Sequence, residues 1–522
     1  MNMKKQIVLY PFLFALYVIL NPLLNNLGKT PLSQAIRPLV VLLLAAVLIM
    51  LICSWIFKNW HYPGYLTFLI LAFFALFGHI RRVLQDWLSL DVAALRPMLL
   101  AVWGGILLAL SVKKVWLHFG GIQTTRILNI YLGIVLLVSI FSGMPTLAKT
   151  IAHPVAQNES TPPPSSESTI KLDCSNTPDI YYIIMDAYGR ADVLKDLYGV
   201  NNTGFITMLE GKGFYVASQS HSNYIQSIFS IPSALNFSYR ESEPEGSDAV
   251  KYFTGLIADN RLMRSLKNCG YETIAFETGF SFTDHPQVDL YLSSGSPLNN
   301  FENLLLADSP LGWLLGAIYQ KPPSYSYAGH RERVLFDFKE LASIPRMSGP
   351  KMVFAHIVSP HPPFVFDAQG NPIQPSRSYS MNDGDDYAGT WEEYRQGYAG
   401  QVQFVNGMLE KTIDAILAKS SRLPVIIVQG DHGPGGFLNW SSPEKTCLWE
   451  RTSIFNAYYL PGVDTNVLTL NISPVNSFRV VLNAYFKANL ELLPDYSYFT
   501  SHRLTRQIID ITDQSASILN CP

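Results

Sequence analysis

Hydrophobic residues are unevenly distributed, and their pattern divides the chain into two unlike halves. Up to about Pro145 long apolar runs dominate, whereas from Asp179 onward the sequence is mixed, as in a water-soluble domain. Five runs approach the roughly 20 apolar residues that a helix needs to cross a bilayer. They are Ile7–Leu24, Pro38–Phe57, Tyr65–Ile80, Pro97–Val112 and Ile127–Phe141. The pattern predicts an N-terminal α-helical transmembrane domain of about five spans, residues 1–145.

The charges that flank these runs indicate an orientation only weakly. Six Lys and Arg residues fall on one side of the predicted membrane and five on the other, which hardly decides the positive-inside rule. Lys4 and Lys5 favour a cytoplasmic N-terminus, and no small-residue cleavage site follows the first run, so we expect it to be retained. An odd number of spans then places everything after Pro145 outside the cytoplasm.

The segment after the apolar half is rich in Pro and Ser. It covers roughly residues 146–177 and includes NESTPPPSSEST, a composition that cannot build a core and predicts a flexible or extended linker. The net charge of −2 gives no basic surface, so we expect no nucleic-acid partner. Cysteines 174, 269, 447 and 521 form no C-x-x-C pair, which argues against a zinc knuckle; all three possible disulfide connectivities stay open.

Residues 178–522 alternate between short apolar segments and segments of helical periodicity. Three segments have the length and composition of buried strands: the run DIYYIIM, Lys351–Val358 and Pro424–Gln429. A fourth candidate is Ile454–Leu460. Gly400–Ser420 has apolar residues at helical spacing. This alternation predicts an α/β domain with a largely parallel central sheet.

Polar residues follow the predicted strands at the positions where an open α/β sheet collects its chemistry. Asp186 follows the first strand, His361 follows the second after a turn, and Asp431-His432 follows the third. Taken singly, each also has a structural explanation as a helix cap, a turn residue or a loop residue. Two carboxylates and one imidazole together suit Zn²⁺ or Mn²⁺.

The segment NYIQSIFSIPSALN places three serines, Ser227, Ser230 and Ser233, at intervals of three in an otherwise apolar stretch. A metal can lower the pKa of a hydroxyl and make it a nucleophile. The segment also has the features of a helix start, and a helix N-terminus favours a bound phosphate. From this stretch alone, all three serines could equally cap or pack a helix.

The segments YYIIMDAYGRAD, VIIVQGDHGPGG and FNAYYLPG resemble the alkaline phosphatase and sulfatase superfamily. The likeness is greatest to its membrane-anchored branch, which includes lipoteichoic acid synthases, other phosphoglycerol transferases and lipid A phosphoethanolamine transferases. This resemblance implies an alkaline-phosphatase-like catalytic domain. It also implies one divalent metal ion, Mn or Zn, held by Asp186, Ser227, Asp431 and His432.

The resemblance also implies which serine reacts. Phosphoethanolamine transferases carry T-x-x-S-V-P, and S-I-F-S-I-P here places Ser227 at the nucleophile position. His361 matches a substrate-binding histidine, whereas we expect His356 to be a packed core residue. Sulfatases require C/S-x-P-x-R, and reading from Ser230 puts Ala234 where Arg should stand, which argues against sulfate ester hydrolysis.

The expected function is that of a multi-pass cell-membrane enzyme with an extracytoplasmic catalytic domain. It would transfer a phosphorylated alcohol group from a membrane phospholipid donor to an envelope glycan or lipid acceptor, through a phospho-Ser227 intermediate. Two alternatives stay open. One is a phosphate or sulfate ester hydrolase of the same fold, and the other is a non-catalytic sensor or scaffold for envelope lipids.

Overall fold

The computed structural model describes most of the 522-residue chain. The described residues are 6–25, 32–88, 92–110, 121–152, 169–239, 247–280, 282–285, 287–294, 300–306, 309–319, 325–501 and 508–522. The chain forms two compact units. Unit 1 comprises residues 1–158 with 296–325, and unit 2 comprises 159–295 with 326–522. Residues 296–325 were predicted to belong to the catalytic domain, but in the structure they group with the N-terminal helices.

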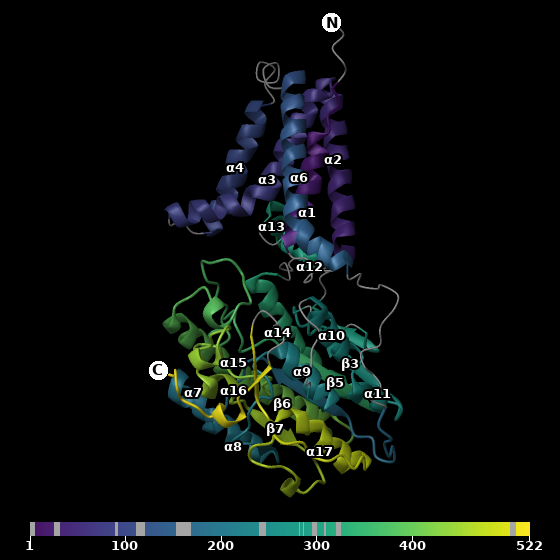
Figure 1. The fold of residues 1–522 in the computed structure, drawn as a ribbon, viewed down its shortest axis with the longest axis vertical. Helices are drawn as coiled ribbons and strands as arrows, with labels where there is room; N and C mark the ends of the chain where they lie inside the picture. Colours follow the sequence, from purple (N-terminus) through teal and green to yellow (C-terminus); the bar gives the residue numbers. More distant parts are fainter. Residues whose placement is uncertain are drawn as a thin grey trace. The chain divides into compact units, whose positions relative to one another are not determined.

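Unit 1 is helical (Figure 1). Its elements are α1 (Tyr10–Asn25), the 3₁₀ turn η1 (Leu32–Ala35), α2 (Ile36–Phe57), α3 (His61–Leu88), α4 (Val92–Leu110), α6 (Ile122–Ala152), α12 (Asn300–Leu306) and α13 (Pro310–Tyr319). Each of the five predicted apolar runs lies largely in one described helix: α1, α2, α3, α4 or α6. Among the described residues, three stretches are long and apolar enough to cross a membrane: Ile36–Phe57, His61–Arg81 and Ile122–Ser142. Tyr10–Leu24 and Pro97–Leu110 are apolar but shorter.

Helix α2 has the surface expected of a lipid-facing helix. Its sequence is apolar all round, and Leu44 and Trp55 are 63% and 84% exposed. Such a surface is stable only in a non-aqueous environment. Helix α6 extends to Ala152, so the first residues of the predicted linker are helical, whereas residues 153–168 lie outside the described part of the chain.

Unit 2 is a layered α/β domain around one seven-stranded sheet. The strand order is β2-β7-β6-β1-β5-β3-β4, and only the two pairings that involve β7 are antiparallel. The strands are β1 (Ile180–Met185), β2 (Tyr215–Val216), β3 (Glu272–Phe276), β4 (Leu290–Leu292), β5 (Lys351–Ile357), β6 (Val425–Gln429) and β7 (Asn456–Tyr459). The four predicted strands are therefore confirmed, together with the largely parallel sheet. Strands β8 (Tyr498–Thr500) and β9 (Ile508–Asp510) form a separate small sheet.

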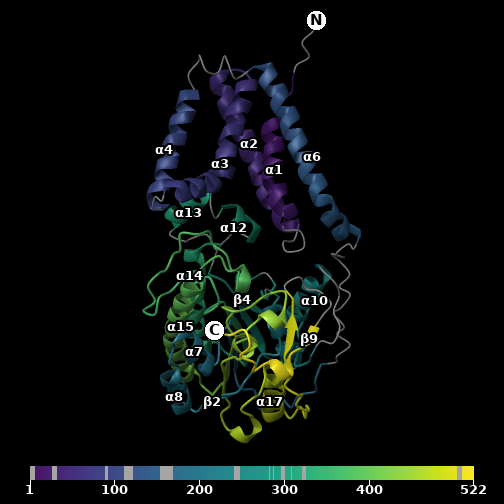
Figure 2. The same cartoon turned by 60° about the vertical axis from the view of Figure 1, so that its left-hand side comes forward.

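Two hydrophobic cores lie on opposite faces of this sheet. Helices lie on either side of the sheet (Figures 1 and 2). Along β1, Tyr181 and Ile183 belong to one core, whereas Tyr182 and Ile184 belong to the other. This alternation follows from the pleat of a strand buried on both faces. The helices are α7 (Ala191–Tyr198), α8 (Thr203–Gly211), α9 (Ser227–Asn236), α10 (Ser247–Ala258), α11 (Arg261–Lys267), α14 (Tyr327–Leu341), α15 (Trp391–Lys419), α16 (Leu448–Thr452) and α17 (Pro474–Phe486).

The structure selects one of the three possible disulfide connectivities. Cys174 pairs with Cys269, and Cys447 pairs with Cys521. Cys53, in α2, is free. Disulfides form and persist mainly in oxidising compartments, so the pairing agrees with an extracytoplasmic location of unit 2.

Candidate metal and nucleophile site

The predicted site residues meet at the carboxyl ends of three adjacent strands. Strand β1 lies between β5 and β6 and is parallel to both. Asp186 follows β1 directly, and Asp431 follows β6 after one glycine. The backbone N–H of His361, beyond β5, donates to the carbonyl oxygen of Asp186 at 3.0 Å. The parallel register therefore brings together residues that are far apart in the sequence.

Helix α9 supplies the serine. Ser227 is its first residue and is 8% exposed, and its Oγ lies 3.2 Å from Nε2 of His432. Ser230 instead donates through Oγ to the carbonyl oxygen of Asp431 at 2.7 Å, and Ser233 donates to the carbonyl oxygen of Ser238 at 2.8 Å. Of the three serines, Ser227 is the one whose hydroxyl faces the imidazole of the site.

The carboxylates of Asp186 and Asp431 are buried and incompletely hydrogen-bonded. One ligand atom from each of Asp186, Asp431 and His432 fits within a 4.8 Å spread. Both side-chain oxygens of Asp186 and Oδ2 of Asp431 lack a hydrogen-bond partner among the described residues. A buried carboxylate oxygen that accepts no hydrogen bond is costly, and a bound cation lowers that cost.

The spacing of the donor atoms also suits a metal ion. Nε2 of His432 lies 3.6 Å from an oxygen of Asp186, 3.6 Å from an oxygen of Asp431 and 3.2 Å from Oγ of Ser227. Two ligands bound about 2.1 Å from a tetrahedral metal lie about 3.4 Å apart. The two carboxylates, the hydroxyl and the imidazole therefore fit a divalent cation such as Zn²⁺ or Mn²⁺.

The surrounding charges favour the metal-binding protonation states of Asp186 and His432. Burial alone would raise the pKa of Asp186, but the imidazoles of His361, His356 and His432 hold that pKa below its usual value. Burial and the nearby guanidinium of Arg451 lower the pKa of His432. An ionised carboxylate and a neutral imidazole are the forms that ligate metals.

His356 is a site residue that the sequence analysis did not foresee. It is fully buried, as expected, but its Nε2 lies 3.2 Å from Oδ2 of Asp186, while Nδ1 lies 3.1 Å from Oγ1 of Thr283. In the parallel register His356 pairs with Ile184, two residues before Asp186. Because side chains alternate between the faces of a strand, His356 and Asp186 lie on the same face of the sheet. This proximity can be predicted only when the pairing register of the two strands is known.

A family model described as Sulfatase matches residues 178–454, more than half of the chain. The chain belongs to the sulfatase family. The predicted superfamily is thereby confirmed, and membership indicates an enzyme that transfers or hydrolyses phosphoryl or sulfuryl groups. None of the curated protein sequences matches this sulfatase-family chain.

Several solved structures resemble the protein at low sequence identity. The C-terminal periplasmic domain of EcEptC from Escherichia coli, in complex with Zn, is 12% identical, with a TM-score of 0.44; the match covers 68% of this chain and 99% of that one. The corresponding domain of the phosphoethanolamine transferase EptC from Campylobacter jejuni is 13% identical, with a TM-score of 0.36 and coverage of 59% and 89%. A phosphonate monoester hydrolase from Agrobacterium radiobacter is 12% identical, with a TM-score of 0.40 and coverage of 62% and 80%.

A buried ion pair lies beside the candidate metal and nucleophile site of this sulfatase-family protein. Arg451 donates through Nη1 to Oδ2 of Asp383 at 2.7 Å and to the carbonyl oxygen of Gly433 at 3.0 Å. Its Nη2 lies 3.4 Å from Nε2 of His432. Burial would raise the pKa of Asp383, but the guanidinium of Arg451 holds it below its usual value. Arg451 thus fixes the loop that carries His432, a role with no local sequence signal.

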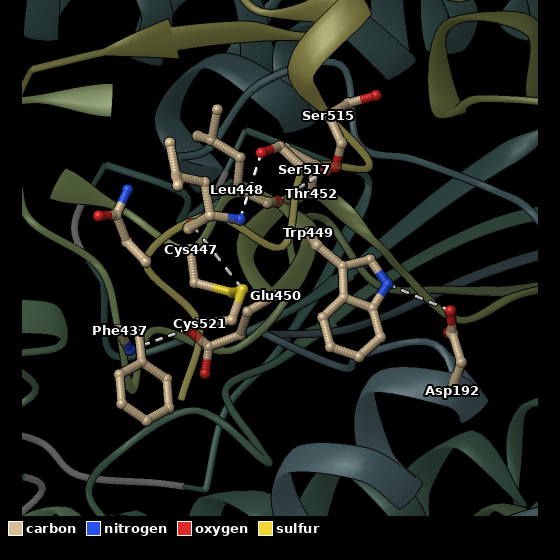
Figure 3. Close-up of a disulfide and its surroundings, with 12 residues drawn as sticks. Asp192, Phe437, Cys447, Leu448, Trp449, Glu450, Thr452, Ser515, Ser517 and Cys521 are labelled. Atoms are coloured by element: carbon tan, nitrogen blue, oxygen red, sulfur yellow. Dashed lines mark hydrogen bonds between the residues drawn. A yellow bond between two sulfur atoms is a disulfide. The ribbon is translucent and has the colours of Figure 1, made fainter. Parts of the chain in front are cut away.

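The second disulfide anchors the short helix that carries Arg451 (Figure 3). Cys447 is the N-cap residue of α16, and its bond to Cys521 ties the C-terminal segment to this helix. The backbone N–H of Trp449 donates to the carbonyl oxygen of Ser517 at 3.1 Å. Glu450 accepts from the backbone N–H of Phe437 at 2.8 Å, and burial raises its pKa to about 8.

Replacing Arg451 by methionine should destabilise unit 2. The substitution leaves the carboxylate of Asp383 buried without its guanidinium partner, and the loss of one partner of a buried ion pair typically costs about 3–5 kcal/mol. We expect a clearly lower melting temperature of the purified full-length protein. The double variant Arg451→Met with Asp383→Asn should melt above the single variant, because it removes the unpaired charge.

The matched control is Arg395→Met. Arg395 pairs with Glu392, but both side chains are well exposed, at 37% and 54%. An exposed pair of this kind contributes at most about 1 kcal/mol. An Arg451→Met protein that melts like the control would contradict the structural role assigned to the buried pair.

A separate cavity of about 560 Å³ lies beside the loop that follows His361. Phe364 and Tyr387 contribute aromatic walls. Its charged lining residues are one cation, Arg377, and two carboxylates, Asp367 and Glu393. This balance of charges does not favour binding of an anionic phosphoryl group in the cavity.

Proposed function

We propose that the protein is a membrane-anchored, metal-dependent transferase. It moves a phosphorylated alcohol group, of the phosphoglycerol or phosphoethanolamine type, from a phospholipid donor to an envelope glycan or lipid. The observation that carries the proposal is the 3.2 Å approach of Ser227 Oγ to His432 Nε2, beside carboxylate oxygens of Asp186 and Asp431 that accept no hydrogen bond from the described residues. That arrangement supports a serine nucleophile with Zn²⁺ or Mn²⁺ as its activator.

The proposed reaction has two steps on the chain's own residues. A divalent cation held by Asp186, Asp431 and His432 would lower the pKa of the Ser227 hydroxyl. Ser227 gives its hydroxyl proton to solvent and its Oγ attacks phosphorus, the bond from phosphorus to the lipid alcohol breaks, and His361 gives the leaving alkoxide a proton. The acceptor hydroxyl then gives its proton to His361 and attacks phosphorus, and the bond from phosphorus to Ser227 Oγ breaks while Ser227 takes a proton from solvent.

The first turn of α9 supports the charge that develops in both steps. The first backbone N–H groups of a helix have no partner within it, and the helix dipole favours negative charge at that end. Ser227 occupies this position in a ten-residue helix. A phosphoryl group on Ser227 would therefore lie where N–H donors are available without reorganisation.

Sulfate ester hydrolysis has less support in the serine geometry. The serine that aligns best with the sulfatase motif is Ser230, and its hydroxyl is already engaged by the carbonyl oxygen of Asp431 at 2.7 Å. A reacting residue needs a free oxygen that faces the metal ligands. Ser227 meets this requirement and Ser230 does not.

A product analysis tests the transferase against the hydrolase. The purified full-length protein is incubated with a phospholipid labelled in its headgroup and with an envelope glycan or lipid extract. Label on the acceptor supports the transferase, and free headgroup phosphate with no labelled acceptor indicates the hydrolase. Absence of any headgroup release, with metal bound, would favour the non-catalytic sensor.

The same proposal predicts that unit 2 lies outside the cytoplasm, because a lipid donor in the outer leaflet can be reached only from that side of the membrane. A reporter that is active only in the cytoplasm should be silent when fused at residue 161. The same reporter fused after Trp60, between α2 and α3, should be active and serves as the matched control. A signal at residue 161 would overturn both the topology and the outer-leaflet donor.

A further inference from the structure

Residues 296–325 form an excursion of the catalytic half of the sequence into unit 1. The chain passes from one unit to the other three times, after residues 158, 295 and 325. Phe301 of α12 is 1% exposed and belongs to a hydrophobic cluster with Ile19 and Leu23 of α1 and Ala35 of η1. Glu302 forms an ion pair with Arg37 at the start of α2. The excursion is therefore packed against the membrane helices.

This contact lies at one particular end of the helix bundle. The chain leaves α1 at Asn25 and enters α2 at Ile36, and α12 packs between these two points. Figure 2 shows α12 and α13 at the end of the bundle where α1 ends. With a cytoplasmic N-terminus, that end is the extracytoplasmic one, the only end that a segment of an extracytoplasmic catalytic half could reach.

Helix α13 has an unusual surface for a segment of a water-soluble domain. Its sequence, PLGWLLGAIY, contains no charged residue. Leu311, Trp313 and Leu314 are 43%, 36% and 50% exposed. A cluster of exposed apolar side chains needs a partner that is not water. The helix is also in contact with α3, whose first 21 residues form a candidate span.

The length of α13 shows whether the helix could cross the bilayer or only lie in its interfacial layer. Ten residues of helix extend about 15 Å, half of the roughly 30 Å hydrocarbon core of a bilayer. The helix is too short to cross. A short apolar helix beside a membrane span, carrying a tryptophan, suits the interfacial layer, where tryptophan is enriched.

We propose that α13 lies in the outer-leaflet interface and inserts Leu311, Trp313 and Leu314 among the lipids. The bilayer is its occupant because α13 is in contact with α3 and α12, which belong to the same unit as the candidate membrane spans. The excursion thereby attaches the catalytic half to the bilayer at a second place, besides the covalent connection that follows α6. If the proposed function holds, this second attachment raises the effective concentration of the catalytic site at its lipid donor.

Spin-label depth measurements test the placement independently of activity. Leu314→Cys is labelled in a Cys53→Ala background, in the full-length protein reconstituted into phosphatidylcholine–phosphatidylglycerol vesicles. Collision with oxygen reports contact with lipid, and collision with a water-soluble nickel complex reports contact with water. The controls are Leu44→Cys on the lipid-facing surface of α2, which is 63% exposed, and Leu423→Cys in unit 2, which is 58% exposed.

We expect the label at residue 314 to resemble that at residue 44, with access to oxygen and little access to nickel. A label that resembles residue 423 would place α13 in water and overturn the proposal. A label shielded from both reagents would show that protein covers the helix, from the catalytic unit or from a second copy. That result would overturn the proposal as well.

A second measurement tests the catalytic consequence, which rests on the proposed function. Leu311→Gln with Leu314→Gln should lower turnover of a phospholipid in vesicles about tenfold or more, and leave turnover of a short-chain, water-soluble phosphodiester unchanged. An equal loss on both substrates, or no loss on either, contradicts a second attachment. If the unmodified protein turns over neither substrate, the proposed function fails, while the depth measurement still decides where α13 lies.

Discussion

Ser227→Ala should abolish turnover, with a loss of about four orders of magnitude or more. The reason is chemical, because a phosphorylated serine intermediate needs the one oxygen that faces the metal ligands. The neighbouring hydroxyl of Ser230 cannot replace it, since it lies about one helical turn further on and is hydrogen-bonded to the carbonyl oxygen of Asp431. The measurement is headgroup release from a phospholipid, with folding checked by a thermal melt.

The other two serines of α9 are matched controls for this experiment. Ser230→Ala removes a buried hydrogen bond and should cost about 1–3 kcal/mol of stability while retaining most of the rate. Ser233→Ala loses a hydrogen bond at the far end of the helix, to the carbonyl oxygen of Ser238, and should keep the rate unchanged. An inactive Ser230→Ala beside a normally active Ser227→Ala would show that the nucleophile has been placed three residues too early. The sulfatase-like register would then have to be reconsidered.

The features that the sequence analysis predicted are those with local signals. Strands β1, β5 and β6 are short unbroken apolar runs, and the sheet brings the residues after them together because the three strands are parallel neighbours. Knowing the strand ends was therefore enough to expect Asp186, His361 and Asp431 near one another. The choice of Ser227 over Ser230 came from a motif match, and the hydroxyl orientations now give it a physical reason.

Other elements were missed because their local sequence points elsewhere. Strand β3, ETIAF, is short and carries two polar residues, so it lacks the apolar run of its neighbours. Helix α15 begins at Trp391, nine residues before the predicted start. The prediction placed the start too late because Gly397 and Gly400 weaken the helical pattern of the sequence. At Gly397 any Cβ would come within 2.4 Å of the Phe364 ring, so close packing explains that glycine. The capping box of Thr390 and Glu393 was the available signal for the true start.

The remaining misses are contacts between residues far apart in the sequence. Arg451 and Asp383 are separated by 68 positions, and neither stands in a recognisable motif. The sequence of α12 and α13 is typical of an apolar segment of a catalytic domain. The packing of α12 against α1 and η1 shows that the segment is part of unit 1. Hydrophobic periodicity indicates that a helix buries a face, but not which part of the molecule covers that face.

Removing divalent metal should abolish turnover, and adding Zn²⁺ or Mn²⁺ should restore it. The physical reason is the pair of buried carboxylates of Asp186 and Asp431, whose like charges repel and which keep oxygens that accept no hydrogen bond from the described residues. A ligand present at about a thousand times its Kd adds about 4 kcal/mol of stability. The metal-free protein should therefore also melt at a lower temperature, a readout that does not depend on any substrate.

Substitution of a ligand should reproduce the effect of chelation. Asp431→Asn keeps the shape of the side chain but removes the charge, so we expect loss of bound metal by elemental analysis together with loss of turnover. Asp414→Asn is the control, because Asp414 is 53% exposed and pairs with Lys212 on the surface of unit 2. It should retain one metal ion per chain and full activity. Full activity after exhaustive chelation, with elemental analysis showing no metal left, would contradict the metal site, because Asp186 and Asp431 would then have to serve catalysis without the cation that their burial calls for.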